Sequence, residues 1–238
     1  MKLLILGSTG MLGHMVKKYL DDFFELDNLL ARWPDPEFED RIKTSDADYL
    51  INCVGAIPQR TNKFDINFKL PIFLDKNFKG RIIHPGTDCE MDRDEYGISK
   101  KLARDYIVSE GTRTKIIKSS IIGPELLTKA SLLEWFLNSN GSVNGYSKAM
   151  WSGITTLQWA KLCKNLIDDW DSFSKENIVE STCLSKYDLL HAIKSTFNKQ
   201  ITIYPNDQVE INKCLVGSLK VISIQKQLKE LKEYYYDN

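Results

Sequence analysis

Tyr96 and Lys100 lie four residues apart in a segment, 96–109, whose sequence predicts a helix. Residues at this spacing share one helix face, with their side chains stacked one turn over the other. A tyrosine, with a free pKa near ~10, is a poor acid at neutral pH, but a neighbouring ammonium stabilises the phenolate and lowers that pKa. Such a pair could protonate a developing alkoxide. Taken alone, a tyrosine and a lysine at this spacing are more often a solvated helix face.

Three glycines near the N-terminus, Gly7, Gly10 and Gly13, have the spacing of a phosphate-binding turn. A short apolar strand at 2–6 precedes them, and 11–20 has the apolar spacing of a helix. Gly7 permits the tight turn, Gly10 lets the backbone approach a pyrophosphate, and Gly13 lets the helix pack close to the strand. The order of strand, turn and helix favours a dinucleotide site over an ordinary glycine-rich turn. It also favours proton transfer as the role of the tyrosine–lysine pair.

Strands and helices alternate along the chain, which predicts a doubly wound parallel α/β sheet with helices on both faces. The stretch between Arg32 and Tyr49 is too short for the usual strand and full helix, and 67–79 leaves room for one abbreviated helix. The expected strands are 2–6, 28–32, 49–54, 81–84, 115–119 and 177–179, and the expected helices begin near Met11, Tyr96, Leu132, Thr156, Lys186 and Ile224.

The composition is that of a soluble enzyme-sized chain. With 238 residues, 42% hydrophobic content and a formal net charge of zero, the chain can bury one substantial core, and no charge excess indicates a nucleic-acid partner. The first apolar run is too short for a secretory leader or a membrane span, so a cytoplasmic location without membrane contact is expected. The five cysteines lack the spacing of a zinc site, which indicates reduced thiols and no metal.

These motifs together resemble the extended short-chain dehydrogenase/reductase family, in the sugar-nucleotide branch typified by dTDP-4-dehydrorhamnose reductase. The resemblance covers nearly the whole chain. The segments that carry it are 7–14 (GSTGMLGH), 51–55 (INCVG), 87–89 (TDC), 96–100 (YGISK), 119–123 (SSIIG), 132–136 (LLEWF), 151–156 (WSGITT) and 185–190 (SKYDLL).

The resemblance implies a Rossmann-type cofactor domain and a smaller C-terminal substrate-binding lobe. The cofactor domain would span 1–123 and about 154–180, and the lobe would span 124–153 and 181–238. The substrate would lie between them. A monomer or a homodimer is expected.

The identity of the cofactor is expected at the end of the second strand, where an acidic residue suits NAD and a basic residue suits the 2′-phosphate of NADP. Arg32 is the basic choice, with a planar fork that suits a phosphate, although Asp35 lies only three residues further on. NADPH is therefore preferred, with NADH possible. The resemblance implies these cofactor-binding residues: Gly7, Ser8, Thr9, Gly10, Met11, Leu12, Gly13, Arg32, Asn52, Val54, Gly55, Tyr96, Lys100, Ser120 and Ile121.

The resemblance also implies an activity, the NADPH-dependent reduction of the 4-keto group of a dTDP- or UDP-linked 6-deoxyhexose. Tyr96 would give a proton to the ketone oxygen, Thr87 would hold that oxygen, and Lys100 would lower the tyrosine pKa and hold the nicotinamide ribose. Lys148 and Trp151 fall where the family contacts the sugar nucleotide.

Two alternatives stay open. Cys89 occupies the place of a cysteine that acts as the base in related epimerase/reductases, which would make the enzyme a bifunctional 3,5-epimerase/4-reductase. The connection from Thr87 to Tyr96 is also shorter than is usual in the family, as in a protein that has lost catalysis and become a non-catalytic NADP-binding regulatory subunit. The presence of Thr87, Tyr96 and Lys100 favours the reductase.

Overall fold

The computed structural model describes residues 1–237, and the chain divides into two compact units. The first unit holds Met1–Lys118 and Ala160–Asn177, and the second holds Ser119–Trp159 and Ile178–Asn238. Within residues 1–237, no helix is both long enough and apolar enough to cross a membrane.

The strands are β1 (Lys2–Leu6), β2 (Glu25–Leu29), β3 (Tyr49–Asn52), β4 (Arg81–Gly86), β5 (Thr114–Lys118), β6 (Ile121–Ile122), β7 (Ser142–Trp151), β8 (Ile154–Thr155), β9 (Glu176–Glu180), β10 (Leu184–Ser185), β11 (Thr202–Lys213) and β12 (Leu219–Lys220). The helices are α1 (Met11–Leu20), α2 (Pro36–Thr44), α3 (Ile66–Asn77), α4 (Glu95–Ser109), α5 (Leu132–Asn138), α6 (Thr156–Asp168), α7 (Lys186–Thr196) and α8 (Ile224–Tyr235), with short 3₁₀ helices η1 (Asp88–Met91) and η2 (Trp170–Ser172).

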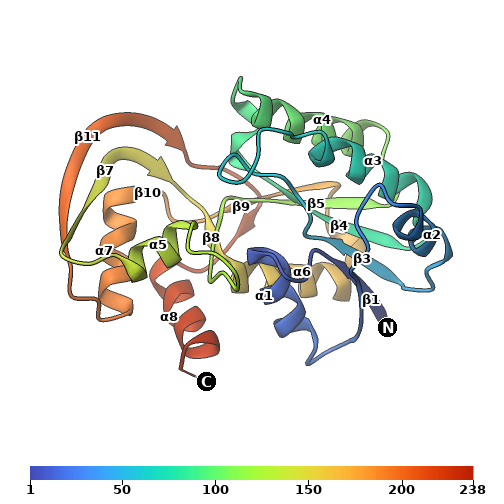
Figure 1. Ribbon diagram of the computed structural model, residues 1–238, viewed down its shortest axis with the longest axis horizontal. Helices are drawn as coiled ribbons and strands as arrows, with labels where there is room; N and C mark the ends of the chain where they lie inside the picture. Colours follow the sequence, from blue (N-terminus) through green and yellow to red (C-terminus); the bar gives the residue numbers. More distant parts are fainter. Residues whose placement is uncertain (238) are drawn as a thin grey trace. The chain divides into compact units, whose positions relative to one another are not determined.

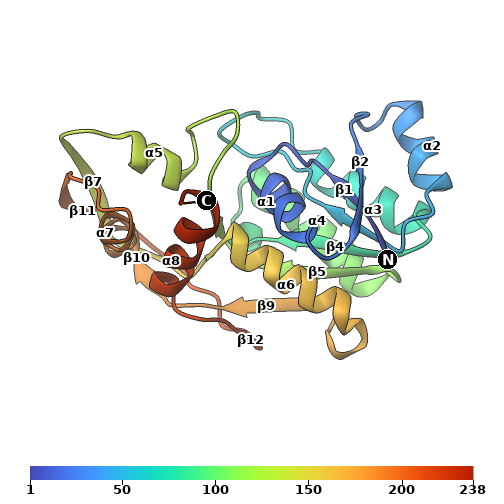
Figure 2. The same cartoon turned by 90° about the horizontal axis from the view of Figure 1, so that it is seen from below.

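The main sheet of the described chain is seven-stranded, in the order β12-β9-β5-β4-β3-β1-β2. The pairs β2–β1, β1–β3, β3–β4 and β4–β5 are parallel, and the division between the two units falls within β9. Figure 1 shows α3 and α4 over one face of the first unit's strands and α1 and α6 over the other, and Figure 2 shows the same layers from below. The expected doubly wound α/β fold of Rossmann type is confirmed.

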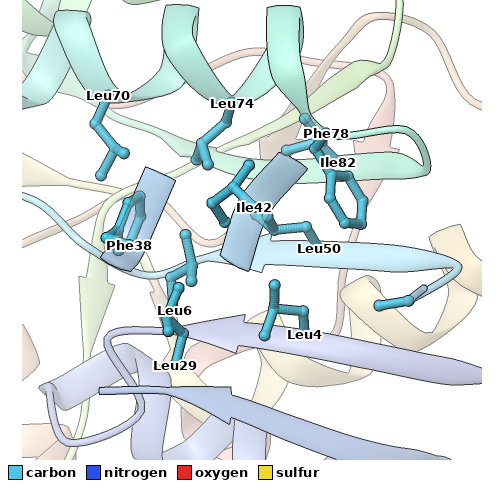
Figure 3. Packing of buried hydrophobic residues seen from close by; sticks show 11 residues of the cluster. Leu4, Leu6, Leu29, Phe38, Ile42, Leu50, Leu70, Leu74, Phe78 and Ile82 are labelled. Carbon is cyan, nitrogen blue, oxygen red and sulfur yellow. The ribbon is translucent and has the colours of Figure 1, made fainter. Parts of the chain in front are cut away.

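A cluster of buried side chains joins one face of the first unit's strands to α2 and α3. Figure 3 shows strand residues such as Leu4 and Leu50 packed against Phe38 of α2 and Leu74 of α3. Alternate residues of a strand point to the same face of a sheet, and residues four apart share one face of a helix. These two periods bring the apolar side chains of four strands and two helices into one core.

Helix α2 occupies the stretch between Arg32 and Tyr49 that seemed too short for a strand and a full helix. The strand is absent, and the helix has nine residues. Asp35 precedes the helix in extended backbone, Pro36 opens it, and Phe38 and Ile42 face the core. Proline suits the first helical position because its fixed φ is already helical and its missing N–H has no partner there.

The second strand begins and ends three residues earlier than the sequence predicts. The expected range was 28–32, whereas β2 spans Glu25–Leu29 because it pairs with β1 from Lys2↔Glu25 to Leu6↔Leu29. Leu30 belongs to the apolar run that suggested the later position, but its side chain is 79% exposed. Arg32 therefore lies in the loop after the strand and not at its end.

The second unit contains a three-stranded sheet that the sequence did not predict. Its order is β10-β7-β11, with β7 parallel to β11 and antiparallel to β10. Helix α7 packs so closely on β7 that a Cβ at Gly145 would lie 2.8 Å from the Cα of Tyr187. In α8, Gln227 accepts a hydrogen bond from the backbone N–H of Thr155 at 3.0 Å and donates one to Ile222. These contacts tie both helices to the unit's strands.

The boundary after β5 also differs from the expected domain limits, which placed 119–123 in the cofactor domain. Strand β6 pairs with β8, and the N–H of Ile154 donates to the carbonyl of Ser120 at 2.9 Å. Residues 119–123 and 154–159, which the expected limits placed together in the cofactor domain, both belong to the second unit.

A disulfide joins Cys183 to Cys214 in the second unit, so the expectation that all cysteines are reduced was wrong. Cys183 directly precedes β10 and Cys214 directly follows β11, the two strands that flank β7. Residues 31 apart in sequence therefore meet at one end of this sheet. Sequence spacing could not show this pairing, because it depends on the order of the strands.

Replacing both disulfide cysteines, Cys183→Ser with Cys214→Ser, is expected to lower the free energy of unfolding by about 2–4 kcal/mol, because the cross-link restricts the unfolded chain. Urea titration of the oxidised wild type and the double variant measures this loss. Reductant should bring the wild type to the stability of the variant and leave the variant unchanged. Two alkylatable thiols at these positions in the non-reduced wild type would contradict the pairing.

Candidate active site

The glycine turn between β1 and α1 has the backbone geometry that a phosphate-binding loop needs. Gly7 adopts φ +72°, which L side chains rarely adopt, and its carbonyl accepts a hydrogen bond from the N–H of Gly10 at 3.0 Å. A Cβ at Gly13 would lie 2.1 Å from the carbonyl oxygen of Gly7. Gly13 therefore lets the first turn of α1 lie directly against the loop. Ser8 and Thr9 form the tip of the loop, and Met11 and Leu12 open the helix.

Gly10 places no side chain in front of this turn. A Cβ at Gly10 would meet only the Gly7 oxygen, at 3.4 Å, so a side chain there would extend into open space. The N-terminus of α1 has no side-chain cap at Gly10 and no acidic residue in its first turn. The first N–H groups of the helix and its positive dipole end therefore face a position that suits an anion.

The loop after β3 lies beside the turn at the same edge of the sheet. The carbonyl of Leu6 accepts a hydrogen bond from the N–H of Cys53, and Asn52, which ends β3, is buried. The side chain of Asn52 accepts a hydrogen bond from the N–H of Val54 at 3.1 Å and so shapes the turn into Gly55. Asn52, Val54 and Gly55 therefore lie at the same edge of the sheet as the glycine turn.

His84, on β4, is a neutral partner of Asn52. The ring Nδ1 of His84 accepts a hydrogen bond from the amide of Asn52 at 3.1 Å. Burial, together with the nearby charge of Lys100, holds the pKa of His84 well below its ordinary value. His84 is therefore a packing residue.

Thr87 lies immediately after β4, where it caps η1. Its hydroxyl donates to Asp88 Oδ1 at 3.1 Å and accepts from the N–H of Cys89 at 3.2 Å. The thiol of Cys89 also donates to Asp88 Oδ1, at 3.6 Å. The single hydroxyl proton of Thr87 is thus directed to a carboxylate, and the hydroxyl must rotate before it can donate to another oxygen.

Tyr96 lies in the first turn of α4 and shares a side-chain hydrogen bond with Thr87. Its ring packs edge-on against Phe64, with ring centroids 5.7 Å apart. The pKa of Tyr96 is raised, first by burial and then by the negative groups around it, while the bond to Thr87 acts in the opposite direction. This differs from the expectation that Lys100 would lower the pKa. Tyr96 keeps its proton at neutral pH and can act as an acid.

Lys100 follows one turn later on the same helix, with a buried ammonium group. Its Nζ donates to the carbonyl oxygen of Pro85, on β4, at 3.0 Å. Burial lowers the pKa of Lys100 to about 8, although the negative groups Glu90 and Cys89 oppose the decrease. The Lys100 ammonium therefore loses its proton close to neutral pH.

Asn67, on α3, is a supporting residue that the sequence analysis did not identify. Its amide donates to Ser99 Oγ at 3.1 Å, and its carbonyl oxygen accepts from the N–H of Ala56 at 2.7 Å. Asn67 thus joins the loop after β3 to the helix that carries Tyr96 and Lys100. The available signal was an asparagine between two apolar residues in a segment expected to form a helix. Its hydrogen-bond partners are far away in sequence, so the signal did not show what it contacts.

The remaining expected site residues lie on other segments of the chain. Arg32 is exposed in the loop after β2, in the first unit. Ser120 and Ile121 belong to the second unit. There Lys148 is exposed on β7, while Trp151 is only 5% exposed, and its ring lies where a Cβ of Gly153 would be. Trp151 is thus part of that unit's interior.

The fold belongs to the Rossmann class, with a glycine turn and a polar cluster at the carboxyl edge of a parallel sheet, where open α/β sheets bind ligands. No protein-family model and no curated protein sequence matches the chain. Solved structures do match it over almost their whole length, and they show that the chain has the fold of sugar-nucleotide reductases and their relatives.

Three of these structures illustrate the likeness. A dTDP-4-dehydrorhamnose reductase from Clostridium acetobutylicum matches with a TM-score of 0.74 at 15% identity, over 98% of this chain and 99% of that chain. A dTDP-4-dehydrorhamnose reductase from Bacillus anthracis in complex with NADP matches with a TM-score of 0.76 at 13% identity, over 97% of this chain and 98% of that chain. A UDP-glucose 4-epimerase from Thermotoga maritima with UDP-glucose matches with a TM-score of 0.75 at 13% identity, over 100% of this chain and 99% of that chain.

The glycine turn leads to a paired prediction. Gly10→Ala should change the free energy of unfolding by no more than ~1 kcal/mol, yet weaken NADPH binding at least about tenfold, or ~1.4 kcal/mol, because the methyl group would enter the space in front of the helix. Gly13→Ala should instead cost about 1–3 kcal/mol of stability, because its methyl group overlaps the Gly7 carbonyl. Fluorescence titration with NADPH and thermal unfolding measure the two effects. NADPH binding that is unchanged in Gly10→Ala would exclude this turn as the phosphate site.

Proposed function

We propose that this protein is an NADPH-dependent reductase of the 4-keto group of a nucleotide-activated 6-deoxyhexose, of the dTDP- or UDP-4-dehydrorhamnose kind. The observation that carries the proposal is the cluster at the carboxyl edge of the sheet. A protonated Tyr96, a hydroxyl at Thr87 and a buried ammonium at Lys100 lie together there, in the same unit as the glycine turn.

Tyr96 acts as the acid in this proposal. Reduction of a ketone places negative charge on its oxygen, and a proton donor beside that oxygen stabilises the charge as it develops. Because the pKa of Tyr96 is raised, its phenol stays protonated at neutral pH and has a proton to give. Thr87, which is hydrogen-bonded to Tyr96, turns its hydroxyl from Asp88 to the same oxygen.

Lys100 supplies positive charge beneath this pair. Its ammonium donates to the carbonyl of Pro85, and an ammonium carries three donors. The others suit the hydroxyl groups of a ribose. The positive charge also favours the phenolate that remains after Tyr96 has given its proton.

The cofactor, when bound, supplies the hydride for the ketone carbon. Gly7, Gly10 and the N-terminus of α1 would hold its pyrophosphate, and Arg32 would receive a 2′-phosphate from the loop after β2. The Bacillus anthracis reductase of the same fold is in complex with NADP, which supports this choice. The two reductases and the epimerase with UDP-glucose support a sugar-nucleotide substrate.

Cys89 carries a second candidate function, that of a 3,5-epimerase/4-reductase. Its thiol lies in the cluster beside Tyr96, where the charge of Lys100 interacts with it and would favour the thiolate form that a base needs. The third possibility is a regulatory subunit that binds NADP without catalysis. Such a protein would bind NADPH but would not turn over a keto-sugar.

Turnover of dTDP- and UDP-linked 4-keto-6-deoxyglucose with NADPH, with and without an added 3,5-epimerase, tests the proposal. Rhamnose formed only with the epimerase is the expected product, identified by NMR. Tyr96→Phe should lower kcat by about 10²- to 10⁴-fold, because it removes the proton donor, while Tyr106→Phe on the same helix serves as the matched control.

Each other outcome has a definite meaning. Rhamnose formed without the epimerase, and lost in Cys89→Ser, would establish the bifunctional enzyme. NADPH binding without oxidation of either substrate would favour the regulatory subunit, and full activity in Tyr96→Phe would exclude the proposed acid.

The pH dependence of kcat/KM is expected to show a decrease above about pH 8, because this parameter reports the free enzyme and Lys100 is the group that loses its proton there. Tyr96 does not account for such a limb, since its pKa is raised and it remains protonated. Initial rates measured between about pH 6 and pH 10 test the assignment. A profile that stays flat to the alkaline end would contradict the role of the Lys100 charge.

A further inference from the structure

Glu90, in η1, is a buried carboxylate that the proposed mechanism does not use. Only 3% of the residue is exposed, and its two oxygens have different partners. Oε1 accepts a hydrogen bond from the backbone N–H of Thr87 at 3.1 Å, which completes a capping box. Oε2 forms an ion pair with Lys118 at 2.6 Å. Gly86 leaves room for this carboxylate, since a Cβ there would lie 3.2 Å from Oε1.

Lys118, at the end of β5, connects Glu90 to the helix that carries the acid. Its Nζ lies 3.3 Å from Glu176 at the start of β9. Glu176 in turn accepts hydrogen bonds from Arg104 Nε and Nη2, at 3.1 and 2.8 Å. Arg104 lies on α4, one turn beyond Lys100 and two turns beyond Tyr96. Charges of alternating sign therefore connect η1, β5, β9 and α4 in turn, all within the first unit.

This charge chain connects the segment of Thr87 to α4. Direct packing connects them as well, since a Cβ at Gly97 would lie 2.4 Å from the carbonyl oxygen of Cys89. The covalent connection between Thr87 and Tyr96 is short, and no long loop supports it. Packing and charge pairing thus set the distance between the two residues that share the hydrogen bond.

The charge of Glu90 also affects the proton-carrying groups. It raises the pKa of Lys100 and contributes to the raised pKa of Tyr96. The other charged or titratable groups that face this region come from η1, α4, β4 and β5, namely Asp88, Cys89, Tyr96, Lys100, His84 and Lys118.

We propose that Glu90 is a positioning residue of the candidate site, which with Lys118 fixes the backbone of Thr87 relative to α4 and supplies the negative charge that faces Lys100. The catalytic meaning of this role rests on the proposed reductase function. The charge coupling between Glu90 and Lys100 does not, and it can be measured without turnover.

Glu90→Gln is the informative variant, because it keeps an oxygen for the N–H of Thr87 and removes only the charge. Glu110→Gln is the matched control, since it removes an exposed carboxylate just after α4, the helix that carries Lys100. NMR titration of lysine labelled with ¹³C at Cε follows Lys100, whose signal is assigned by its loss in Lys100→Met. We expect the pKa of Lys100 to fall by about one unit in Glu90→Gln and to stay unchanged in the control. An unchanged pKa in Glu90→Gln would overturn the proposal.

Kinetics provide the second readout where the wild type has the proposed activity. The alkaline limb of kcat/KM should move about one pH unit lower in Glu90→Gln, in addition to any loss of kcat/KM below the limb that follows from a weaker hold on Thr87. A limb left in place, whatever the loss of activity, would overturn the proposal. If the wild type reduces no keto-sugar, the proposed function fails, and the NMR titration still decides the role of Glu90.

Lys118 tests the pairing itself. Lys118→Met leaves Glu90 buried without its cation, while Lys118→Arg keeps the charge and should retain the wild-type pH limb. In Glu90→Gln with Lys118→Met both charges are absent, and this double variant should unfold at a higher temperature than Lys118→Met alone. Equal or lower stability of the double variant would contradict the ion pair. If Lys118→Met does not fold, recovery of a folded protein in the double variant gives the same answer, and its absence contradicts the pairing.

Discussion

The candidate site depends on the parallel pairing of β1, β3 and β4. Their register places Leu6 opposite Asn52 and Ile51 opposite Ile83, so the three strands end at the same edge of the sheet. The glycine turn, the loop after β3 and the segment that begins at Thr87 all start from this edge. Helices cover both faces, so the edge is where the chain presents backbone and polar groups to a ligand. A change in the register of any of these strands would separate the groups.

Two close approaches of backbone then set the positions of the helices relative to this edge. Gly13 brings α1 onto the glycine turn, and Gly97 brings the first turn of α4 onto η1. At each position a methyl group would overlap a carbonyl oxygen. The two glycines therefore have the same physical task, one for the proposed phosphate site and one for the tyrosine and lysine.

Burial at the cluster has opposite effects on its two proton carriers. A low-dielectric surrounding disfavours the charged form of each group, which raises the pKa of Tyr96 and lowers the pKa of Lys100. The ammonium is retained near neutral pH because negative groups stand near it. Glu90, one of these negative groups, is itself buried and needs a partner of opposite charge. Lys118 is that partner. The ion pair thus offsets the cost of burying the carboxylate that helps keep Lys100 protonated.

The sequence by itself determined the features that depend on neighbouring residues. The glycine turn, the first strand, the helix with Tyr96 and Lys100 and the alternation of strands and helices follow from local spacing, and these were enough to predict the fold. The Thr87-to-Glu90 spacing is also a local capping signal, which the sequence analysis passed over. Only the tertiary structure decided the rest: the end of β2, the loop position of Arg32, the β10-β7-β11 sheet, the Cys183–Cys214 bond and the ion pairs of Lys118. Each of these depends on segments far apart in the chain, and local periodicity carries no information about which of them meet.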